Sequence, residues 1–229
     1  MSNNKKEKVI FLFPALNEEE GIGKTIREIP IKELEKLGYC CEIVAIDGQS
    51  TDRTVEIAKK EGATVLISPK RGYGYQYKHG LSKIKGDYVI TGDADGTYPF
   101  NHAALLLEAL KKENFDFITT NRFNHLEKGS MSFSHLLGNK ILTLIANSLF
   151  GLKLKDSQCG MWCFKLDKIK ELNLEDDDMA FSEEIKIKSF KKLKCKEVDI
   201  NYKKREGTSK LNYGHAFKNM MFLFRQRLK

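Results

Sequence analysis

The sequence predicts an α/β fold in which a mostly parallel sheet is flanked by helices. Short apolar runs alternate with helix-like segments over the first two-thirds of the chain, which is typical of βαβ units. The chain has 229 residues, 41% of them hydrophobic, enough for one domain with a substantial core. No internal repeat or linker-like stretch interrupts it. We therefore expect a single domain over residues 1–229.

The first half supplies the predicted strands and the helices between them. One helix is expected to start at the acidic residues 17–20, and a second to run from Thr51 or Asp52 to Lys60, with Gly62 as its stop. Two more are expected at Gly74–Ile84 and Phe100–Lys112. The expected strands are Lys8–Phe13, Glu42–Ile46, Thr64–Ile67, Asp87–Thr91 and Phe115–Thr119.

Two further segments have helical periodicity but open interpretations. Ser134–Phe150 is apolar with a thin polar stripe (His135, Asn139, Thr143 and Asn147), which fits either a core helix or a helix at a membrane interface. Residues 214–229 form a basic amphipathic tail with Phe and Met on one face. Such a helix suits an anionic membrane surface, and equally an ordinary terminal helix packed on the domain.

Charge and composition restrict the partners and the compartment. Asn201–Lys229 carries eight basic residues and one acid, so +7 of the net charge of +8 lies at one end, which argues against a nucleic-acid binder. The longest uncharged apolar run in the middle of the chain, Ile141–Leu152, is shorter than the roughly 20 residues of a bilayer span. No signal peptide is recognisable, and the five cysteines form no CxxC pair; Cys159 and Cys163 are expected to be buried packing residues. We expect a cytoplasmic protein.

Three polar loops follow predicted strands, at positions where α/β sheets bind ligands. They read PALNE after the first strand, DGQSTDRT after the second and GDADG after the fourth. Because the carboxyl ends of parallel strands meet at one edge of the sheet, these loops should converge. Asp52, at a helix start, is expected to act as a cap.

Asp93 and Asp95 are the sharpest of these features. A strand that ends in a turn can aim both carboxylates at one point, where they repel each other unless a divalent cation lies between them. Mg²⁺ or Mn²⁺ prefers a few carboxylates together with phosphate oxygens and water. The pair therefore predicts a metal that holds a diphosphate, although a plain polar turn remains the alternative.

Arg71-Gly72-Tyr73-Gly74 precedes the third helix. Glycines permit close approach of the backbone, a helix amino end favours an anion, and Arg71 adds a fixed positive charge. The Walker loop and the dinucleotide fingerprint are both absent.

Taken in order, these motifs resemble a known family. PALNEEE, DGQSTDRT, RGYGYQYKHG and GDADGTYP look like the inverting family-2 glycosyltransferases of GT-A fold. LGNKILTLIANSLFG, DSQCGMW, AFSEEI and KKREGTSKL narrow the resemblance to dolichyl-phosphate (polyprenyl-phosphate) sugar synthases, over about residues 8–213. The resemblance implies a donor-binding half over about residues 8–122 and an acceptor-side half over about 123–213.

The resemblance implies roles on the donor side. The nucleotide-sugar would be held by residues of the first three loops and the RGYG segment: Pro14, Leu16, Asn17, Glu18, Asp47, Arg71, Asp93, Ala94 and Asp95. Asp93 and Asp95 would hold Mg²⁺ or Mn²⁺. Thr97 stands where some relatives place a further Gln ligand, Leu16 where the family often has Tyr, and Gly48 where it often has a second Asp.

The acceptor would be a dolichyl or polyprenyl phosphate at the membrane surface, bound peripherally on the cytoplasmic face. Its phosphate is already an oxyanion and needs no catalytic base, only a cationic clamp. The resemblance places Asp95, Arg122 and Arg205 in catalysis. The expected phosphate contacts are Arg122, Asn139, Arg205, Ser209 and Lys210.

Alternatives remain open at this point. The DADG sequence favours UDP-glucose or UDP-N-acetylglucosamine, because mannose synthases of the family that use GDP-mannose typically read DADL. A hydroxyl acceptor would require a base, for which Glu183 or Glu184 is the candidate. A non-catalytic nucleotide-binding or membrane-binding protein is the third possibility. The oligomeric state is not predicted.

Overall fold

The computed structural model describes residues 6–207 and 213–228. Its described strands form one seven-stranded sheet in the order β3-β2-β1-β4-β6-β5-β7. The strands are β1 Lys8–Ala15, β2 Cys40–Asp47, β3 Thr64–Ile67, β4 Tyr88–Thr91, β5 Phe117–Leu126, β6 Trp162–Lys165 and β7 Cys195–Tyr202. Among these described strands, β6 alone runs antiparallel to its neighbours, β4 and β5. The predicted α/β fold with a mostly parallel sheet is confirmed.

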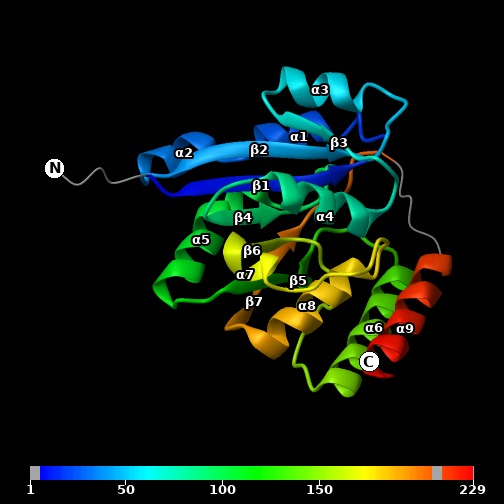
Figure 1. Cartoon of the computed structure of the whole chain (residues 1–229). Helices are drawn as coiled ribbons and strands as arrows, with labels where there is room; N and C mark the ends of the chain where they lie inside the picture. Colours follow the sequence, from blue (N-terminus) through cyan, green and yellow to red (C-terminus); the bar gives the residue numbers. More distant parts are fainter. Residues whose placement is uncertain (1–5, 208–212, 229) are drawn as a thin grey trace.

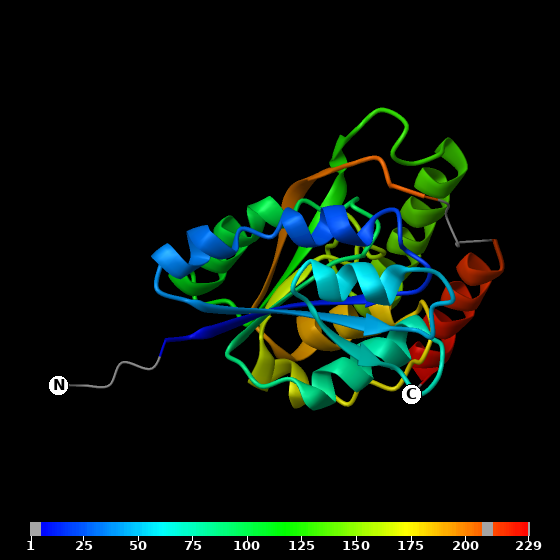
Figure 2. The same ribbon diagram turned by 90° about the horizontal axis from the view of Figure 1, so that it is seen from above.

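Helices cover both faces of this sheet (Figures 1 and 2). They are α1 Ile22–Arg27, α2 Ile31–Lys36, α3 Thr54–Lys60, α4 Tyr73–Lys83, α5 Ala103–Lys112 after a 3₁₀ turn at Phe100–His102, α6 Phe133–Phe150, α7 Leu166–Lys170, α8 Phe181–Lys192 and α9 Tyr213–Leu228.

Side-chain alternation along β1 explains the two layers. Val9, Phe11 and Phe13 face a core shared with α1, α2 and α5, whereas Ile10 and Leu12 face a core shared with α4, α7 and α8. Because successive residues of a strand point to opposite faces, the continuous apolar run KVIFLF is what a strand buried on both sides requires.

The predicted elements differ from the observed ones mainly at their ends. The first helix begins at Ile22 and not at the acidic residues 17–20, because Asn17 takes a left-handed conformation with φ 50°. The second begins at Thr54 and its N-cap is Arg53, not Asp52 as expected. Asp52, one residue earlier, still accepts a hydrogen bond from Thr54 N at 3.0 Å, so it satisfies one free N–H of the helix start. The fifth strand continues to Leu126, past the end expected at Thr119.

Helices α6 and α9 lie side by side at one end of the sheet (Figures 1 and 2). They pack together through Leu142, Ala146 and Leu223, with Ile187 of α8. Cys159 and Cys163 are buried, as expected of packing residues. In the part of the chain that the structure describes, no helix is long and apolar enough to cross a bilayer.

Candidate active site

The carboxyl ends of β2, β1 and β4 lie next to one another, so the three polar loops meet at one edge of the sheet as predicted. The first two loops are joined by hydrogen bonds. Asn17 N donates to Ser50 Oγ at 2.9 Å, Thr51 N donates to Asn17 Oδ1 at 2.8 Å, and Glu18 N donates to Thr54 Oγ1 at 2.7 Å. Asn17 thus holds the two loops together.

Asp47 is buried and stabilises the second loop through hydrogen bonds to its backbone. It is 2% exposed, and its Oδ2 accepts hydrogen bonds from Gln49 N at 2.9 Å and Ser50 N at 3.1 Å. Pro14 is also buried, whereas Leu16 and Glu18 are partly exposed. Among the residues expected to contact the nucleoside, the exposed ones therefore come from the first loop.

Gln76 of α4 is a site residue that the sequence reasoning missed. Its side-chain amide is buried and donates to Ala15 O at 3.1 Å and Ile46 O at 2.7 Å. It thereby fixes the ends of β1 and β2 relative to each other. Its place in RGYGYQYKHG, one helical turn after Gly72, was the available signal.

Asp93 and Asp95 follow β4 directly. Asp95 Oδ1 accepts from Thr97 N at 3.1 Å and Thr97 Oγ1 at 2.6 Å, while Ala94 between the two acids is buried. No residue of the described ranges donates a hydrogen bond to the Asp93 carboxylate. Burial, and then the neighbouring Asp95 charge, raise the pKa of Asp93 to about 7. The hydrogen bonds within the site therefore compensate its negative charge only in part.

This donor set fits a hard divalent cation. Within residues 6–207 and 213–228 no three His, Cys, Asp or Glu side chains converge to hold an ion. Two carboxylates that leave the remaining ligands to phosphate oxygens and water match the preference of Mg²⁺.

Arg205 lies against Asp95 and Glu18. Its Nη1 is 3.5 Å from Asp95 Oδ2, and its Nη2 donates to Glu18 Oε1 at 3.3 Å. The structure therefore brings together one predicted acceptor-side cation and two predicted donor-side acids. Ser209 and Lys210 lie outside the described residues.

Arg122 is placed differently. It is 7% exposed and forms a two-pronged ion pair with Asp156, from Nε to Oδ2 at 2.6 Å and from Nη2 to Oδ1 at 2.9 Å. Burial alone would disfavour ionisation of Asp156, but the Arg122 charge and its hydrogen bonds lower the pKa of this carboxyl. The positive charge of Arg122 is thus matched by a buried carboxylate, a partner that the sequence did not reveal.

The RGYG segment packs against protein backbone. A Cβ at Gly72 would lie 2.6 Å from Asp177 O, and one at Gly74 would lie 2.7 Å from Phe181 Cβ. At the amino end of α4, Tyr75 N donates to Asp177 O at 3.0 Å. The close approach that these glycines permit is therefore made by the 176–177 backbone. Arg71 Nη2 reaches Gln49 O at 3.4 Å, at the edge of the second loop.

The last two residues of the polar stripe of α6 face a loop of the domain. Thr143 Oγ1 bonds to Ser157 Oγ at 3.1 Å, and Asn147 donates to Leu154 O at 2.8 Å. Asn139 Nδ2 approaches Met131 Sδ at 3.6 Å. Thr143 and Asn147 therefore anchor α6 to the loop before β6.

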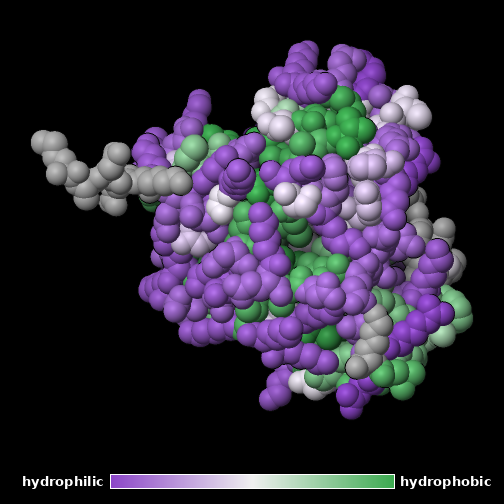
Figure 3. Space-filling view, viewed as in Figure 1, coloured by the Kyte–Doolittle hydropathy of each residue, from purple (hydrophilic) through white to green (hydrophobic). Residues whose placement is uncertain are grey.

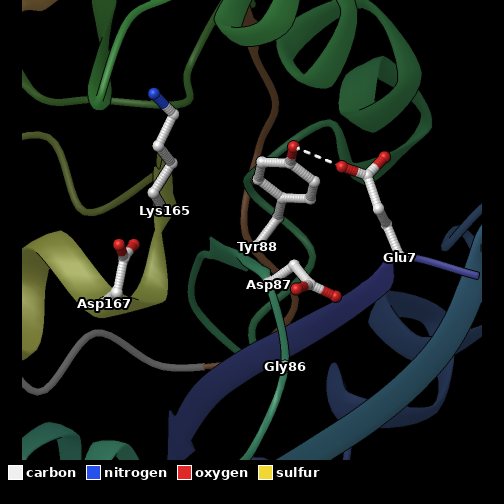
Figure 4. A pocket seen from close by; sticks show the side chains of 6 residues that line it. All are labelled: Glu7, Gly86, Asp87, Tyr88, Lys165 and Asp167. Atoms are coloured by element: carbon white, nitrogen blue, oxygen red, sulfur yellow. Dashed lines mark hydrogen bonds between the residues drawn. The ribbon is translucent and has the colours of Figure 1, made fainter. Parts of the chain in front are cut away.

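A separate small pocket lies at the opposite, amino ends of β1 and β4. Its lining residues are Glu7, Gly86, Asp87, Tyr88, Lys165 and Asp167, shown in Figure 4. Tyr88 Oη donates to Glu7 there at 2.8 Å. Being at the far end of the strands, this pocket is not part of the candidate site.

Comparison with solved structures shows the fold. The glucosyl-3-phosphoglycerate synthase of Mycobacterium tuberculosis, solved with Mn²⁺, uridine diphosphate and glucosyl-3-phosphoglycerate, superposes with a TM-score of 0.74 at 19% identity. The match covers 96% of this chain and 80% of that one. The GT-A arrangement implied by the sequence is confirmed.

Curated relatives are more similar in sequence. The low-salt glycan biosynthesis hexosyltransferase Agl6 of Haloferax volcanii is 33% identical over 216 residues, which is 93% of this chain and 52% of Agl6. The chain thus spans about half the length of Agl6. A dolichyl-phosphate hexose transferase of the same organism is 27% identical over 198 residues, covering 86% of this chain and 83% of the relative. The family model described as glycosyl transferase family 2 matches residues 11–172. This chain therefore belongs to glycosyl transferase family 2, and its three polar loops lie at the carboxyl edge of the sheet.

Proposed function

We propose that this protein transfers a hexose or N-acetylhexosamine from a nucleotide-sugar to a dolichyl or polyprenyl phosphate, with inversion at the anomeric carbon. A phosphate oxygen of the acceptor attacks that carbon, and the nucleoside diphosphate departs with the electron pair of the broken bond. UDP-glucose and UDP-N-acetylglucosamine are favoured over GDP-mannose. The observation that carries the proposal is the acidic pair at the end of β4, a partly exposed Asp93 and a buried Asp95, with Arg205 against Asp95.

Asp93 and Asp95 would hold Mg²⁺ or Mn²⁺. When bound, the ion neutralises charge that develops on the departing diphosphate. The Mn²⁺ and uridine diphosphate in the Mycobacterium tuberculosis structure support this assignment. Glu18 and Asn17 would contact the nucleoside from the first loop, above Asp47 and Pro14. Arg71 would approach the diphosphate, and Asn139 the acceptor phosphate.

A phosphate acceptor is also favoured by the state of the two candidate bases. Glu184 is fully buried and accepts hydrogen bonds from Glu175 N, Asp176 N and Lys188 Nζ, at 2.9, 2.9 and 2.6 Å. Glu183 is fully buried and bonded to Gln158. Neither carboxylate is placed to take a proton from a hydroxyl acceptor.

Membrane contact would be peripheral, on the cytoplasmic face, and made by α6 and α9. The outer face of α6 exposes Phe133, Leu137, Ile141 and Leu144, at helical spacing. The outer face of α9 exposes Phe217, Phe224 and Leu228, with exposed Lys218, Arg225 and Arg227 on the same helix. Figure 3 shows apolar surface at the lower right, over this helix pair. Apolar side chains flanked by cations suit an anionic bilayer.

A transfer assay tests the proposal. Labelled UDP-glucose, UDP-N-acetylglucosamine and GDP-mannose would each be incubated with a polyprenyl phosphate, with Mg²⁺ or with a chelator. We expect metal-dependent label from one donor in the organic phase. No label from any donor, despite nucleotide binding, would contradict the lipid-phosphate acceptor.

Glu184→Gln separates the two acceptor classes. Because a phosphate acceptor needs no base, we expect the variant to keep transfer to polyprenyl phosphate. The loss of one charge-assisted contact should lower the free energy of unfolding by roughly 1–3 kcal/mol, which is measured in parallel by urea unfolding. A folded variant that binds donor but transfers nothing would indicate a base-dependent reaction.

A further inference from the structure

Residues 203–207, which follow β7, form a strap across the Asp95–Thr97 turn. Lys203 N donates to Thr97 O at 3.0 Å and Glu206 N donates to Asp95 O at 2.9 Å. Lys24 of α1 bonds to Glu206 at 2.6 Å. The strap is therefore held to the site by its backbone and by an ion pair that does not involve Arg205.

Between these backbone bonds, the Arg205 side chain bridges two acids. Arg205 Nη1 lies 3.5 Å from Asp95 Oδ2, and Arg205 Nη2 lies 3.3 Å from Glu18 Oε1. The three side chains are only 23%, 8% and 15% exposed, respectively, so the contacts are partly shielded from water. Arg205 thus supplies positive charge to the acidic site when no donor is bound.

Arg205 and a metal would compete for the same oxygen. Asp95 Oδ1 is already engaged by both the backbone and the hydroxyl of Thr97. Oδ2 is the oxygen that faces Arg205. A divalent cation placed there would repel the guanidinium, since two positive charges at a shared ligand destabilise each other. The backbone bonds of the strap allow the side chain to turn away while the strap stays in place.

We propose that Arg205 is a displaceable counter-ion. It neutralises Asp95 and Glu18 in the empty protein, the metal and donor displace it, and the freed guanidinium then binds the acceptor phosphate. The donor must consequently bind before the acceptor. This inference rests on the proposed function, because it assigns an order of binding to the same site.

The test compares Mn²⁺ affinity, without donor, in the wild-type protein and in Arg205→Gln by calorimetry or by the Mn²⁺ spin-resonance signal. Removal of the competing cation should tighten Mn²⁺ binding by roughly threefold or more. Arg27→Gln is the matched control, because it removes a positive charge of α1 whose partner is Glu61, outside the strap. We expect a smaller change there, and circular dichroism checks that each variant is folded.

The second measurement is binding of a short isoprenyl phosphate, such as geranyl phosphate, with and without Mn²⁺ and UDP or GDP. Wild type should bind it more tightly once metal and nucleotide are present, and Arg205→Gln should lose that gain. Equal or weaker Mn²⁺ binding by Arg205→Gln, or no Mn²⁺ binding by either protein, would overturn the inference. If the Mn²⁺ difference is found but no donor yields transfer, the proposed function fails while the counter-ion role stands.

Discussion

Glu183 of α8 is an unusual buried acid. Gln158 donates to its Oε1, and no residue that the structure describes bonds to its Oε2. Asn219 of α9 in turn donates to Gln158 Oε1 at 3.0 Å. Burial raises the pKa of Glu183 to about 8. At neutral pH the side chain is therefore mainly the uncharged acid, which avoids an unpaired buried charge where α8, the 154–159 loop and α9 meet.

This titration predicts a pH-dependent stability difference. Between the ordinary value of 4.5 and about 8 the folded protein keeps a proton that the unfolded chain releases. The contribution of Glu183 to the free energy of unfolding therefore falls as pH rises through that range. Glu183→Gln does not titrate, so its stability relative to wild type should rise from pH 5 to 7.5, by up to about 1.4 kcal/mol per pH unit.

Urea unfolding at pH 5.5, 6.5 and 7.5 measures this difference. Glu108→Gln, at an exposed position of α5, serves as the control and should give a difference that changes little with pH. Parallel stability curves for wild type and Glu183→Gln would show that Glu183 is ionised when folded.

Helix α4 depends on a glycine where another element crosses it. Gly74 lies under the Asp176 carbonyl and Phe181, whereas Gly138 of α6 has open space where a Cβ would lie. Gly74→Ala should therefore lower the free energy of unfolding by roughly 1–3 kcal/mol through overpacking. Gly138→Ala, the matched control, should raise it by about 0.5–1 kcal/mol, because glycine costs entropy within a helix.

Urea unfolding of both variants gives these two values. Binding of uridine diphosphate should weaken in Gly74→Ala, because α4 also carries Gln76, which holds the ends of β1 and β2. A Gly74→Ala protein as stable as wild type would mean that the 175–178 loop shifts freely, and its contact with α4 would then be of little consequence.

The sequence predicted the elements of the first half well, together with the helices α6 and α9 of the second half. It did not predict α7, α8, β6 or β7. Strands with unbroken apolar runs, such as β1, are visible without any knowledge of their neighbours. By contrast, β6 has four residues and gains its place only by pairing antiparallel with β4 and β5. The polar residues Asn121 and Arg122 are not typical of a buried strand, although both lie in β5. The charge of Arg122 is balanced by Asp156, which is 34 positions away in the sequence.

The same distinction applies to the site as a whole. Its location followed from strand order, because three loops at the carboxyl ends of adjacent parallel strands must meet. The contacts of Gln76, Asp156 and Arg205 join segments far apart in the chain, and no local pattern encodes them. The order of the motifs predicted which loops form the candidate site, whereas tertiary packing determines which side chains face each other.

The helix pair α6–α9 gives the molecule one apolar side. If that side lies on a bilayer, Phe133 and Leu144, which are 79% and 66% exposed, would leave water on binding. Burial of a large apolar side chain contributes roughly 1.5–3 kcal/mol, so Phe133→Ser and Leu144→Ser should each weaken binding to phosphatidylglycerol-containing vesicles about tenfold or more. Leu105→Ser is the matched control, because Leu105 is 63% exposed but lies on α5, away from this pair. Vesicle sedimentation in low and high salt measures the effect, and wild-type binding should weaken with salt because the cations of α9 contribute. If Phe133→Ser and Leu144→Ser sediment like Leu105→Ser, the apolar side does not contact the membrane.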